Sequence, residues 1–350
     1  MLTLVPGRMG GSETYARQLC AALARVGRLD YRVLAPRVAG DAGCGLPATV
    51  VREYGDTRST AARAAAMARA ALFPGRLRRA ARLDELDAIH FPLTVMLPRP
   101  PHDLPVATTI LDLQHEEHPE FFSRAQLLYR RRFYRRPLLE SRIVITISEH
   151  ARRTILERHH LPPERVRAIH LAVDHDRFAP DGRPRESFLL YPANAWPHKN
   201  HRRLFEAFAL VRRERAELRL VLTGIGHERL TLPPGVESRG HVSLDELIAL
   251  YRTAAAVVYP SLYEGFGMPC LEAMACGAPV AASNVASLPE VCGDAAVYLD
   301  PTSVESIADA IRRALDDPPG GGVEQAARFT WERCAREHDL VYEKLSRGHA

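Results

Sequence analysis

The sequence is poor in lysine and in long apolar runs. Only Lys199 and Lys344 are lysines among the 47 basic residues of the 350-residue chain. We attribute this arginine bias, together with the abundant alanine, to the codon habit of a GC-rich genome. No apolar run approaches the roughly 20 residues that a membrane-spanning helix needs. The sequence therefore predicts no membrane-spanning segment, and Lys199 stands out as a candidate for a specific role.

Cysteines are few, and their spacing forms no recognisable framework. The six cysteines include no CxxC pair and no spacing with histidine that is typical of zinc ligands. The first residues also lack the charged region and apolar stretch of a secretion signal. These absences argue against a disulfide framework or a structural zinc site, and they predict a protein of the reducing cytoplasm. The ordinary composition, 46% hydrophobic and 25% charged, excludes a disordered or collagen-like chain.

Short apolar segments alternate with amphipathic ones, a pattern typical of parallel sheets flanked by helices. The expected strands are 2–5, 31–34, 87–91, 106–111, 142–147, 187–193, 218–223, 256–259, 279–283 and 296–299. The expected helices include 13–26, 149–158, 200–215, 244–252, 269–276 and 304–315, and a helix at 57–82 broken near residue 74. The first strand is short for a central strand of a sheet. We expect either a native start further upstream or an unusually short strand.

The polar, turn-rich segment 178–186 predicts a linker between two α/β domains. The expected domains are an N-terminal one at 1–178 and a C-terminal one at 186–325. A final helix from about Val323 to Leu345, within a C-terminal region 326–350, is expected to pack across both domains. Parallel sheets bind ligands at the carboxyl ends of their strands, so the loops after the strands are the places to look for a site.

The most informative segment is YPSLYEGFGMPCLEAMACG, residues 259–277. Gly265 and Gly267 precede a helix whose free amide groups and positive end favour a phosphate. Glu264 lies in the loop and Glu272 in the helix, and their carboxylate oxygens can accept hydrogen bonds from sugar hydroxyls. We interpret the segment as a site for a phosphorylated sugar. The alternative is a plain loop with solvated glutamates.

A second segment, YPANAWPHKNH at 191–201, joins an apolar strand to an amphipathic helix. Lys199 stands at the start of that helix, where the helix dipole disfavours a cation. A lysine is favourable there if an external anion binds beside it, so we predict a phosphate contact for Lys199; a surface lysine is the alternative. Trp196 and His198 are expected to line a pocket wall or simply to pack.

Two segments of the first half also follow expected strands. The loop PGRMGGSE at 6–13 carries Gly10 and Gly11, which allow a ligand to approach the backbone closely. It is not a GxGxxG motif, so it does not predict a dinucleotide site. Asp112 and His115, in DLQHEEH at 112–118, follow the strand expected at 106–111. They are candidates for an active site, and a polar loop is the alternative.

Together these residues resemble the retaining glycosyltransferases of family 4. The resemblance rests on the glycine loop, DLQH, PHKN, the TGIG turn at 223–226, and the pair Glu264 and Glu272 with seven residues between them. It implies an α/β protein of the GT-B fold: two Rossmann-like domains whose parallel sheets face each other across a central cleft, and a C-terminal helix that crosses back to the first domain. The segments PGRMGGSE, DLQHEEHPEFF and SNVASLPEVCGDAA are similar to bacterial mannosyltransferase-like members.

The resemblance also implies a role for each candidate residue. Lys199 would bind the diphosphate of the donor, Glu264 its sugar hydroxyls and Glu272 its ribose. Further donor contacts are implied for Gly10, Gly11, Asn194, Gly224, Gly265, Phe266 and Gly267. Asn194 stands where many members have an arginine, so the neutralisation of the diphosphate rests more heavily on Lys199. Leu111 stands where many have a histidine, which leaves Asp112 and His115, beside Lys199 and Glu264, as the candidate catalytic residues.

The implied function is transfer of a sugar, with retention, from GDP-mannose or another nucleotide sugar. The acceptor would be a glycan, a lipid-linked molecule or a natural product, and no metal or other cofactor is expected. A phosphorylase or an epimerase of the same fold is a rival, as is a non-catalytic sugar-nucleotide-binding module of a biosynthetic complex. The scattered arginines predict no nucleic-acid partner.

Arginines cluster at 130–136, RRRFYRR, where Leu127, Leu128, Phe133 and Tyr134 recur at helical spacing. A basic amphipathic helix of this kind can lie on an anionic membrane, which would place the protein peripherally on the inner face of the cytoplasmic membrane. The alternative is a solvated helix whose aromatic side chains turn into the core.

Overall fold

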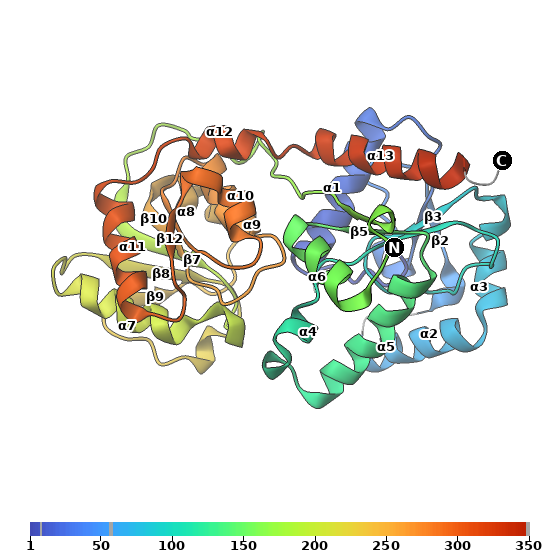
Figure 1. The fold of residues 1–350 in the computed structure, drawn as a ribbon, viewed down its shortest axis with the longest axis horizontal. Coiled ribbons are helices and arrows are strands. Elements are labelled where there is room, and N and C mark those ends of the chain that lie inside the picture. Colours follow the sequence, from blue (N-terminus) through green and yellow to red (C-terminus); the bar gives the residue numbers. More distant parts are fainter. Residues whose placement is uncertain (8, 56–58, 348–350) are drawn as a thin grey trace. The chain divides into compact units, whose positions relative to one another are not determined.

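The structure is a computed structural model of the chain, and it describes residues 1–7, 9–55 and 59–347. The chain divides into two compact units (Figure 1). Unit 1 comprises Met1–Leu171 together with the segment from Trp331 onward, and unit 2 comprises Ala172–Thr330. Unit 1 is therefore built from two pieces of the sequence, and unit 2 from one.

Unit 2 contains a six-stranded parallel sheet in the order β12-β11-β10-β7-β8-β9. Its strands are β7 (Glu186–Pro192), β8 (Arg219–Thr223), β9 (Val236–Ser238), β10 (Ala254–Tyr259), β11 (Val280–Ser283) and β12 (Val297–Leu299). The strand order reverses between β7 and β10, which pair with Leu190 opposite Val257. The loops that follow these two strands therefore leave the sheet side by side, at the place where open α/β sheets bind ligands.

Helices cover both faces of this sheet. They are α7 (His201–Arg212), α8 (Leu244–Thr253), α9 (Met268–Ala275), α10 (Leu288–Cys292), α11 (Val304–Asp316) and α12 (Gly322–Ala327). Figure 1 shows α7 and α11 on one side of the sheet and α8, α9 and α10 on the other. A strand that is covered on both sides needs a continuous apolar run. Phe188–Tyr191 of β7 is such a run, and each of its side chains is at most 2% exposed.

Unit 1 has two parallel sheets. β1 (Val33–Ala35) pairs with β2 (Ala48–Val50), and a four-stranded sheet runs in the order β3 (Ile89–Phe91), β4 (Val106–Thr109), β5 (Ile143–Thr146) and β6 (Val166–Ala168). Its helices are α1 (Gly11–Val26), α2 (Thr60–Leu72), α3 (Pro74–Ala80), α4 (Gln114–Glu117), α5 (Arg124–Glu140), α6 (Glu149–His159) and α13 (Trp331–Arg347). α13 packs along α1 (Figure 1).

A buried chain of hydrogen bonds fixes α13 to the rest of unit 1. It runs from Tyr342 to His90 (2.7 Å), Thr109 (2.8 Å), Tyr15 (2.9 Å) and His338 (2.9 Å), and from His338 Nδ1 to the carbonyl of Cys334 (2.8 Å). A carbonyl only accepts, so Nδ1 of His338 donates. Because burial lowers the pKa of this ring to about 4, Nε2 carries no proton at pH 7 and accepts the hydroxyl proton of Tyr15. The direction of every other bond in the chain then follows, and with both histidines neutral each of these polar groups has a partner.

Two expectations about the secondary structure are corrected by the structure. The strand expected at 2–5 is absent: a hydrogen bond from Leu4 N to Met1 O turns the chain there, and Leu4 is fully buried in a hydrophobic cluster. The single helix expected from Val323 is interrupted between α12 and α13. The interruption places Phe329 in unit 2, where its side chain packs on Phe266 and its carbonyl accepts from His175 at 3.2 Å.

The segment expected as a linker, 178–186, is packed onto unit 2. Arg185 donates to the carbonyls of Tyr251, Arg252, Ala254 and Gly277, and Arg252 donates to the carbonyl of Ala179. These bonds explain why the boundary between the units falls earlier, between Leu171 and Ala172. Turn-forming residues predict an irregular chain but do not show whether it is free.

Candidate active site

The site in unit 2 is organised around an ion pair between Lys199 and Glu264. Lys199 ends a short 3₁₀ helix (Pro197–Lys199) after β7, and Glu264 lies in the loop after β10. Lys199 Nζ lies 2.6 Å from Glu264 Oε1, and the two side chains are only 9% and 11% exposed. Two residues that the sequence analysis singled out separately therefore meet where the strand order reverses. Lys199 is buried, so the alternative of a surface lysine is wrong.

Tyr259, the last residue of β10, holds the other side of the lysine. Lys199 Nζ donates to Tyr259 Oη at 2.8 Å and lies 4.9 Å from the centre of its ring. Burial raises the pKa of Tyr259 well above its usual value, so the hydroxyl stays protonated. Tyr191, on β7, packs edge-on against Tyr259 and donates its hydroxyl to the carbonyl of Lys199. The ammonium group thus has a fixed place between a carboxylate and a phenol.

Asn200 ties the segment of Lys199 to the neighbouring loops. Its backbone is left-handed, with φ at 60°, a conformation that asparagine tolerates better than most residues. Its side-chain amide donates to the carbonyls of Pro260 (3.0 Å) and Pro301 (2.7 Å). Leu262 N donates to the carbonyl of His198 at 2.8 Å. The loops after β7, β10 and β12 are therefore hydrogen-bonded into one rigid surface around Lys199.

Ser287 fixes the loop of Glu264 by hydrogen bonds to its backbone. The hydroxyl of Ser287, fully buried, lies 2.9 Å from the carbonyl oxygen of Glu264 and 2.8 Å from that of Phe266. Phe266 itself is 3% exposed, so its side chain belongs to the core and only its backbone can face a ligand. Gly267, with φ at 110°, leaves no room for a side chain, because a Cβ would lie 2.6 Å from Leu288. Close packing beneath the loop therefore requires the glycine.

Glu272, on α9, is half-buried, and its Oε2 accepts a hydrogen bond from Tyr251 at 2.8 Å. Burial raises the pKa of Glu272 to about 7, against the opposing effect of the tyrosine. The carboxyl group therefore changes between its protonated and ionised forms near neutral pH. Glu272 keeps the acceptor capacity that a ribose contact needs, and Tyr251 orients it.

Asn194 and Gly224 connect the loops after β7 and β8. Asn194 Oδ1 accepts from the amide of Ile225 at 2.9 Å. A Cβ on Gly224 would lie 2.8 Å from the carbonyl oxygen of Ala193 and 2.9 Å from Asn194 Oδ1. Contacts within the protein thus account for both residues, and a contact of either residue with the donor stays a prediction.

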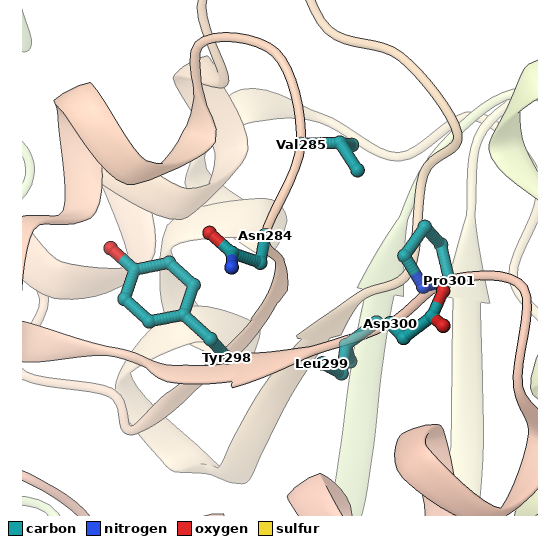
Figure 2. A pocket seen from close by; sticks show the side chains of 6 residues that line it. All are labelled: Asn284, Val285, Tyr298, Leu299, Asp300 and Pro301. Atoms are coloured by element: carbon teal, nitrogen blue, oxygen red, sulfur yellow. The ribbon is translucent and has the colours of Figure 1, made fainter.

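A pocket of about 330 Å³ opens beside these loops, at the carboxyl ends of β11 and β12 (Figure 2). It is lined by Asn284, Val285, Tyr298, Leu299, Asp300 and Pro301. Its wall is linked to the site twice: Pro301 accepts the amide of Asn200, and the segment 284–286 leads directly to Ser287. None of its lining residues was predicted from the sequence.

In unit 1, Gly10 and Gly11 stand at the start of α1. Gly10 has φ at 50°, and a Cβ on either glycine would meet no described atom within 4 Å. The positive φ favours glycine at position 10, and the space around both residues is open to a ligand. In unit 2, by contrast, Gly224 and Gly267 are required by neighbouring protein atoms.

Asp112 and His115 lie around the start of α4. Asp112 Oδ1 accepts from the amide of Gln114 at 3.0 Å. The His115 side chain is 0% exposed and packs edge-on against Tyr134, with ring centres 4.7 Å apart. Burial lowers the pKa of His115 to about 4, so the ring is neutral at pH 7. The structure therefore places His115 in the interior of unit 1, and its catalytic role stays a prediction.

Sequence reasoning missed the partners that position the predicted residues. Tyr259 ends a strand and Tyr251 lies in a helix, both in largely apolar segments that gave no sign of a polar role, and Ser287 lies in a motif to which no role was given.

Within residues 1–7, 9–55 and 59–347, no group of three or more His, Cys, Asp or Glu side chains is placed to hold a metal ion. No helix in the described part of the chain is long and apolar enough to cross a membrane.

Comparison with known families gives two matches that follow each other along the chain. Residues 9–177 match Glycosyltransferase Family 4, and residues 173–332 match Glycosyl transferases group 1. The two matches meet close to the boundary between units 1 and 2.

Two mannosyltransferases are similar in sequence. The O-antigen chain mannosyltransferase B of Escherichia coli is 33% identical over 276 residues, which cover 70% of this chain and 72% of that protein. The MMP alpha-(1->4)-mannosyltransferase of Mycolicibacterium hassiacum is 34% identical over 220 residues, 57% of this chain and 54% of that one. The chain thus spans about half the length of the second relative.

Solved structures share the fold. The sucrose-phosphate synthase from Thermosynechococcus elongatus has a TM-score of 0.75 at 21% identity, over 97% of this chain and 94% of that one. The HepE protein of Anabaena, solved in complex with UDP-glucose, has a TM-score of 0.71 at 17% identity, over 97% of both chains. At such identities the likeness shows the fold alone. The fold class expected from the sequence, an α/β protein of the GT-B type with parallel sheets, is confirmed.

Proposed function

Because this chain belongs to Glycosyltransferase Family 4, and is therefore a glycosyltransferase, we propose that it moves a sugar from a nucleotide-sugar donor to a glycan acceptor with retention of configuration. The observation that carries the proposal is the buried ammonium group of Lys199, held 2.6 Å from Glu264 where the strand order reverses. A buried cation whose carboxylate partner can be replaced by a phosphate is suited to stabilise an anionic leaving group.

Lys199 would stabilise the diphosphate as it leaves. Negative charge develops on the leaving oxygen while the glycosidic bond breaks, and a fixed cation in a poorly hydrated site stabilises that charge more than water does. The amino-terminal amides of α7 and α9 begin beside the same loops and add their partial positive charge. Tyr259 and Glu264 keep the ammonium group in place before the donor arrives.

Donor binding would exchange the partners of this ion pair. The diphosphate replaces Glu264 on Lys199, and the freed carboxylate accepts hydrogen bonds from the hydroxyls of the donor sugar. Glu272, oriented by Tyr251, accepts the ribose hydroxyls.

Retention is proposed to proceed without a covalent intermediate on the protein. The acceptor hydroxyl oxygen bonds to the anomeric carbon on the face from which the diphosphate leaves. The bond from the anomeric carbon to the phosphate oxygen breaks, and that oxygen takes the proton of the acceptor hydroxyl. The protein then needs to bind, orient and neutralise charge, and the buried His115 need not act as a base.

We propose GDP-mannose as the first donor to test and a mannose-containing glycan as the acceptor. The support is that two relatives at 33% and 34% identity are named as mannosyltransferases, one of them for an O-antigen chain. A non-catalytic binding module is not favoured, because these relatives are named as enzymes. We also propose that Lys199 takes the place that a divalent cation has in other transferases, so that no metal cofactor is needed.

A thermal-shift panel with GDP-mannose, UDP-glucose and dTDP-glucose tests the donor. A donor present at 100 times its Kd stabilises the folded state by about 2.7 kcal/mol, which is readily seen as a rise in Tm. We expect the largest rise with GDP-mannose and none for the Lys199→Met variant. Failure of every nucleotide sugar to raise Tm, together with no release of nucleoside diphosphate, would refute the proposed function.

The basic helix α5 is a proposed contact with an anionic membrane surface. Phe133 and Tyr134 pack against core clusters of unit 1, so these aromatics turn inward as the alternative expected. The outer face nevertheless carries Leu128, 72% exposed, with exposed arginines three, four and seven positions later. Arginines around a protruding leucine fit a surface of anionic lipid headgroups.

A further inference from the structure

The pocket at the carboxyl ends of β11 and β12 lies apart from the groups assigned to the donor (Figure 2). The donor contacts assigned in unit 2, from Asn194 to Glu272, all follow β7, β8 or β10. β11 and β12 lie beyond β10, at one edge of the sheet. The volume of the pocket, about 330 Å³, is at the lower end of the roughly 300–1,000 Å³ that small-molecule sites have. It is therefore a candidate for a second binding site.

Hydrogen bonds within unit 2 fix the walls of this pocket. Asn284 N donates to the carbonyl of Leu299 at 2.9 Å, which joins the loop after β11 to the end of β12. Asp300 N donates to Ser306 Oγ at 2.9 Å, and Asp300 Oδ1 accepts from the amide (2.8 Å) and the hydroxyl (2.7 Å) of Thr302. Binding to a pocket that is already shaped costs little free energy of ordering.

The pocket combines hydrogen-bonding groups with apolar ones. Within the described part of the chain, the side-chain amide of Asn284 has no hydrogen-bond partner, so it can both donate to a ligand and accept from it. Asp300 uses only Oδ1 in its bonds to the protein, which leaves Oδ2 as an acceptor. Tyr298 donates its hydroxyl to the carbonyl of Gly293, so its ring offers carbon atoms to the pocket. The remaining lining is apolar: Val285, Leu299 and Pro301.

This set of groups fits a neutral saccharide. Sugar hydroxyls both donate and accept, which matches a carboxylate together with a carboxamide, and the C–H groups of a sugar ring pack on apolar side chains. Among the described residues, no basic side chain lines the pocket. Hydrogen bonds from Thr302 hold the pKa of Asp300 below its usual value, and Arg203, which also lowers it, donates to Asn200. A phosphate would therefore meet a negative charge, and a lipid chain would leave Asn284 and Asp300 unpaired.

A sugar in this pocket would lie close to the proposed reaction. Pro301, in the pocket wall, accepts the side-chain amide of Asn200 at 2.7 Å, and Asn200 directly follows Lys199. The loop after β11 leads to Ser287, whose hydroxyl reaches the carbonyl of Glu264. We propose that the pocket is a second glycan site, which holds an inner, neutral sugar unit of the acceptor while the end of the same chain receives the new sugar. This role rests on the proposed function, whereas the binding of a saccharide does not.

The asparagines of the chain, Asn194, Asn200 and Asn284, allow both sites to be observed in one experiment. NMR of the protein labelled selectively with ¹⁵N-asparagine reports on their side-chain amides, and loss of one signal in Asn284→Ala assigns that of the pocket. The probes are GDP, inorganic phosphate, D-mannose, and the neutral tetrasaccharides α-mannotetraose, maltotetraose and chitotetraose. We expect a tetrasaccharide to shift the Asn284 signal in a saturable titration, and GDP and phosphate to leave that signal in place.

The outcomes of this titration separate the proposed site from its rivals. No shift of the Asn284 signal with any saccharide would overturn the proposal, and so would a shift with GDP or phosphate alone. Equal affinity for D-mannose and the tetrasaccharide would indicate a site for a free sugar and overturn the role in holding an acceptor. If GDP moved no signal while a tetrasaccharide moved that of Asn284, the proposed donor site would fail and the saccharide site would stand.

Kinetics test the role of the pocket in acceptor binding. Asn284→Ala and Asp300→Asn should each raise the KM of the tetrasaccharide acceptor about fivefold, the effect of losing one hydrogen bond. Asp300→Asn keeps an oxygen for Thr302, so the wall of the pocket is retained. The donor KM and the KM of methyl α-mannoside, which has no inner unit, should stay unchanged. Asp317→Asn, which removes an exposed acid at the end of α11, is the matched control. An unchanged KM of the tetrasaccharide, or equal changes for the short and the long acceptor, would overturn this role.

Discussion

Lys199 Nζ and Glu264 Oε1 lie 2.6 Å apart, although 65 positions separate the two residues in the sequence. They meet because β7 and β10 are neighbours at the reversal of strand order, so the loops that follow them converge. Under the proposed function, an anionic donor would compete with the carboxylate of Glu264 for this cation, which makes the pair a direct target for testing.

Removal of either charge is expected to abolish most of the activity. Lys199→Met and Glu264→Gln should each lower kcat/KM with GDP-mannose by about 100- to 1000-fold, the range found when one preorganised group is lost from a transition state. Each single variant also leaves an unpaired buried group and loses stability. The double variant should regain stability without regaining activity, and Lys344→Met is the control for loss of a lysine. Near-normal turnover in either single variant would show that the donor site is elsewhere.

Ser287 is expected to position the loop of Glu264. Ser287→Ala removes the hydroxyl that reaches the carbonyls of Glu264 and Phe266, so kcat should fall about fivefold, the effect of roughly 1 kcal/mol from one hydrogen bond. Ser287→Thr, which keeps the hydroxyl, should restore part of it. Ser303→Ala, which removes the serine that caps α11, is a control for stability. Equal losses of kcat in Ser287→Ala and Ser303→Ala would assign Ser287 a merely structural role.

Glu272 predicts a pH dependence of donor binding. Its pKa is raised to about 7 from an ordinary value of 4.5, so the folded protein holds this proton more tightly than the unfolded chain. Stability due to Glu272 is therefore present below pH 4.5 and lost as the pH rises towards 7. In the folded protein the carboxylate, the better acceptor for ribose hydroxyls, forms around pH 7. We expect the donor KM to fall between pH 6 and 8 (roughly one unit either side of that pKa) in the wild type and to stay flat in Glu272→Gln; a wild-type profile in the variant would contradict the assignment.

The buried histidines of unit 1 predict a loss of stability in acid. Burial lowers the pKa of His338 to about 4 and that of His90 well below its usual value. The unfolded chain therefore takes up these protons first, and the stability is present above pH 6.5 and lost as the pH falls towards 4. The shift of His338 from 6.5 to about 4 contributes up to about 3 kcal/mol, and the shift of His90 acts in the same direction. Urea unfolding at pH 7.5 and pH 5 measures the loss, with His102→Gln, an exposed histidine, as the control; equal stability at both pH values would contradict the neutral network.

Co-sedimentation with vesicles tests the contact proposed for α5. Arg131→Gln combined with Arg135→Gln should weaken binding to phosphatidylglycerol vesicles about 30-fold at low salt, at about 1 kcal/mol for each arginine. Arg213→Gln combined with Arg229→Gln removes two exposed arginines of unit 2 and should change little. Equal binding of the wild type to neutral and anionic vesicles, or none to either, would refute the membrane contact.

The strands that were predicted correctly are those whose own residues form an apolar run. β7 and β10 are apolar over their whole central length because helices cover both faces, and both were predicted close to their observed bounds. β2, β6 and β9 were missed. Each has three residues with exposed or half-exposed positions, and it is a strand only because a neighbouring strand pairs with it. Short edge strands of this kind have no local pattern that separates them from loops.

The same distinction applies to the candidate site. Lys199 and Glu264 could be singled out because each residue is unusual in its own segment. Tyr259, Tyr251 and Ser287 could not, because their roles depend on contacts across 60, 21 and 23 positions, respectively. The burial of His115 could not be predicted either, since polar residues after a strand favour a site but do not reveal which of them the next helix will bury.

The division of unit 1 into two pieces has a consequence for synthesis on the ribosome. Chains emerge from the amino terminus and domains generally fold as they appear. Tyr15, Thr109 and His90 leave the ribosome long before His338 and Tyr342, which come only after the whole of unit 2. Unit 2 can therefore complete its fold first, although it is translated second. The face of α1 that α13 covers is therefore exposed for the time it takes to translate unit 2.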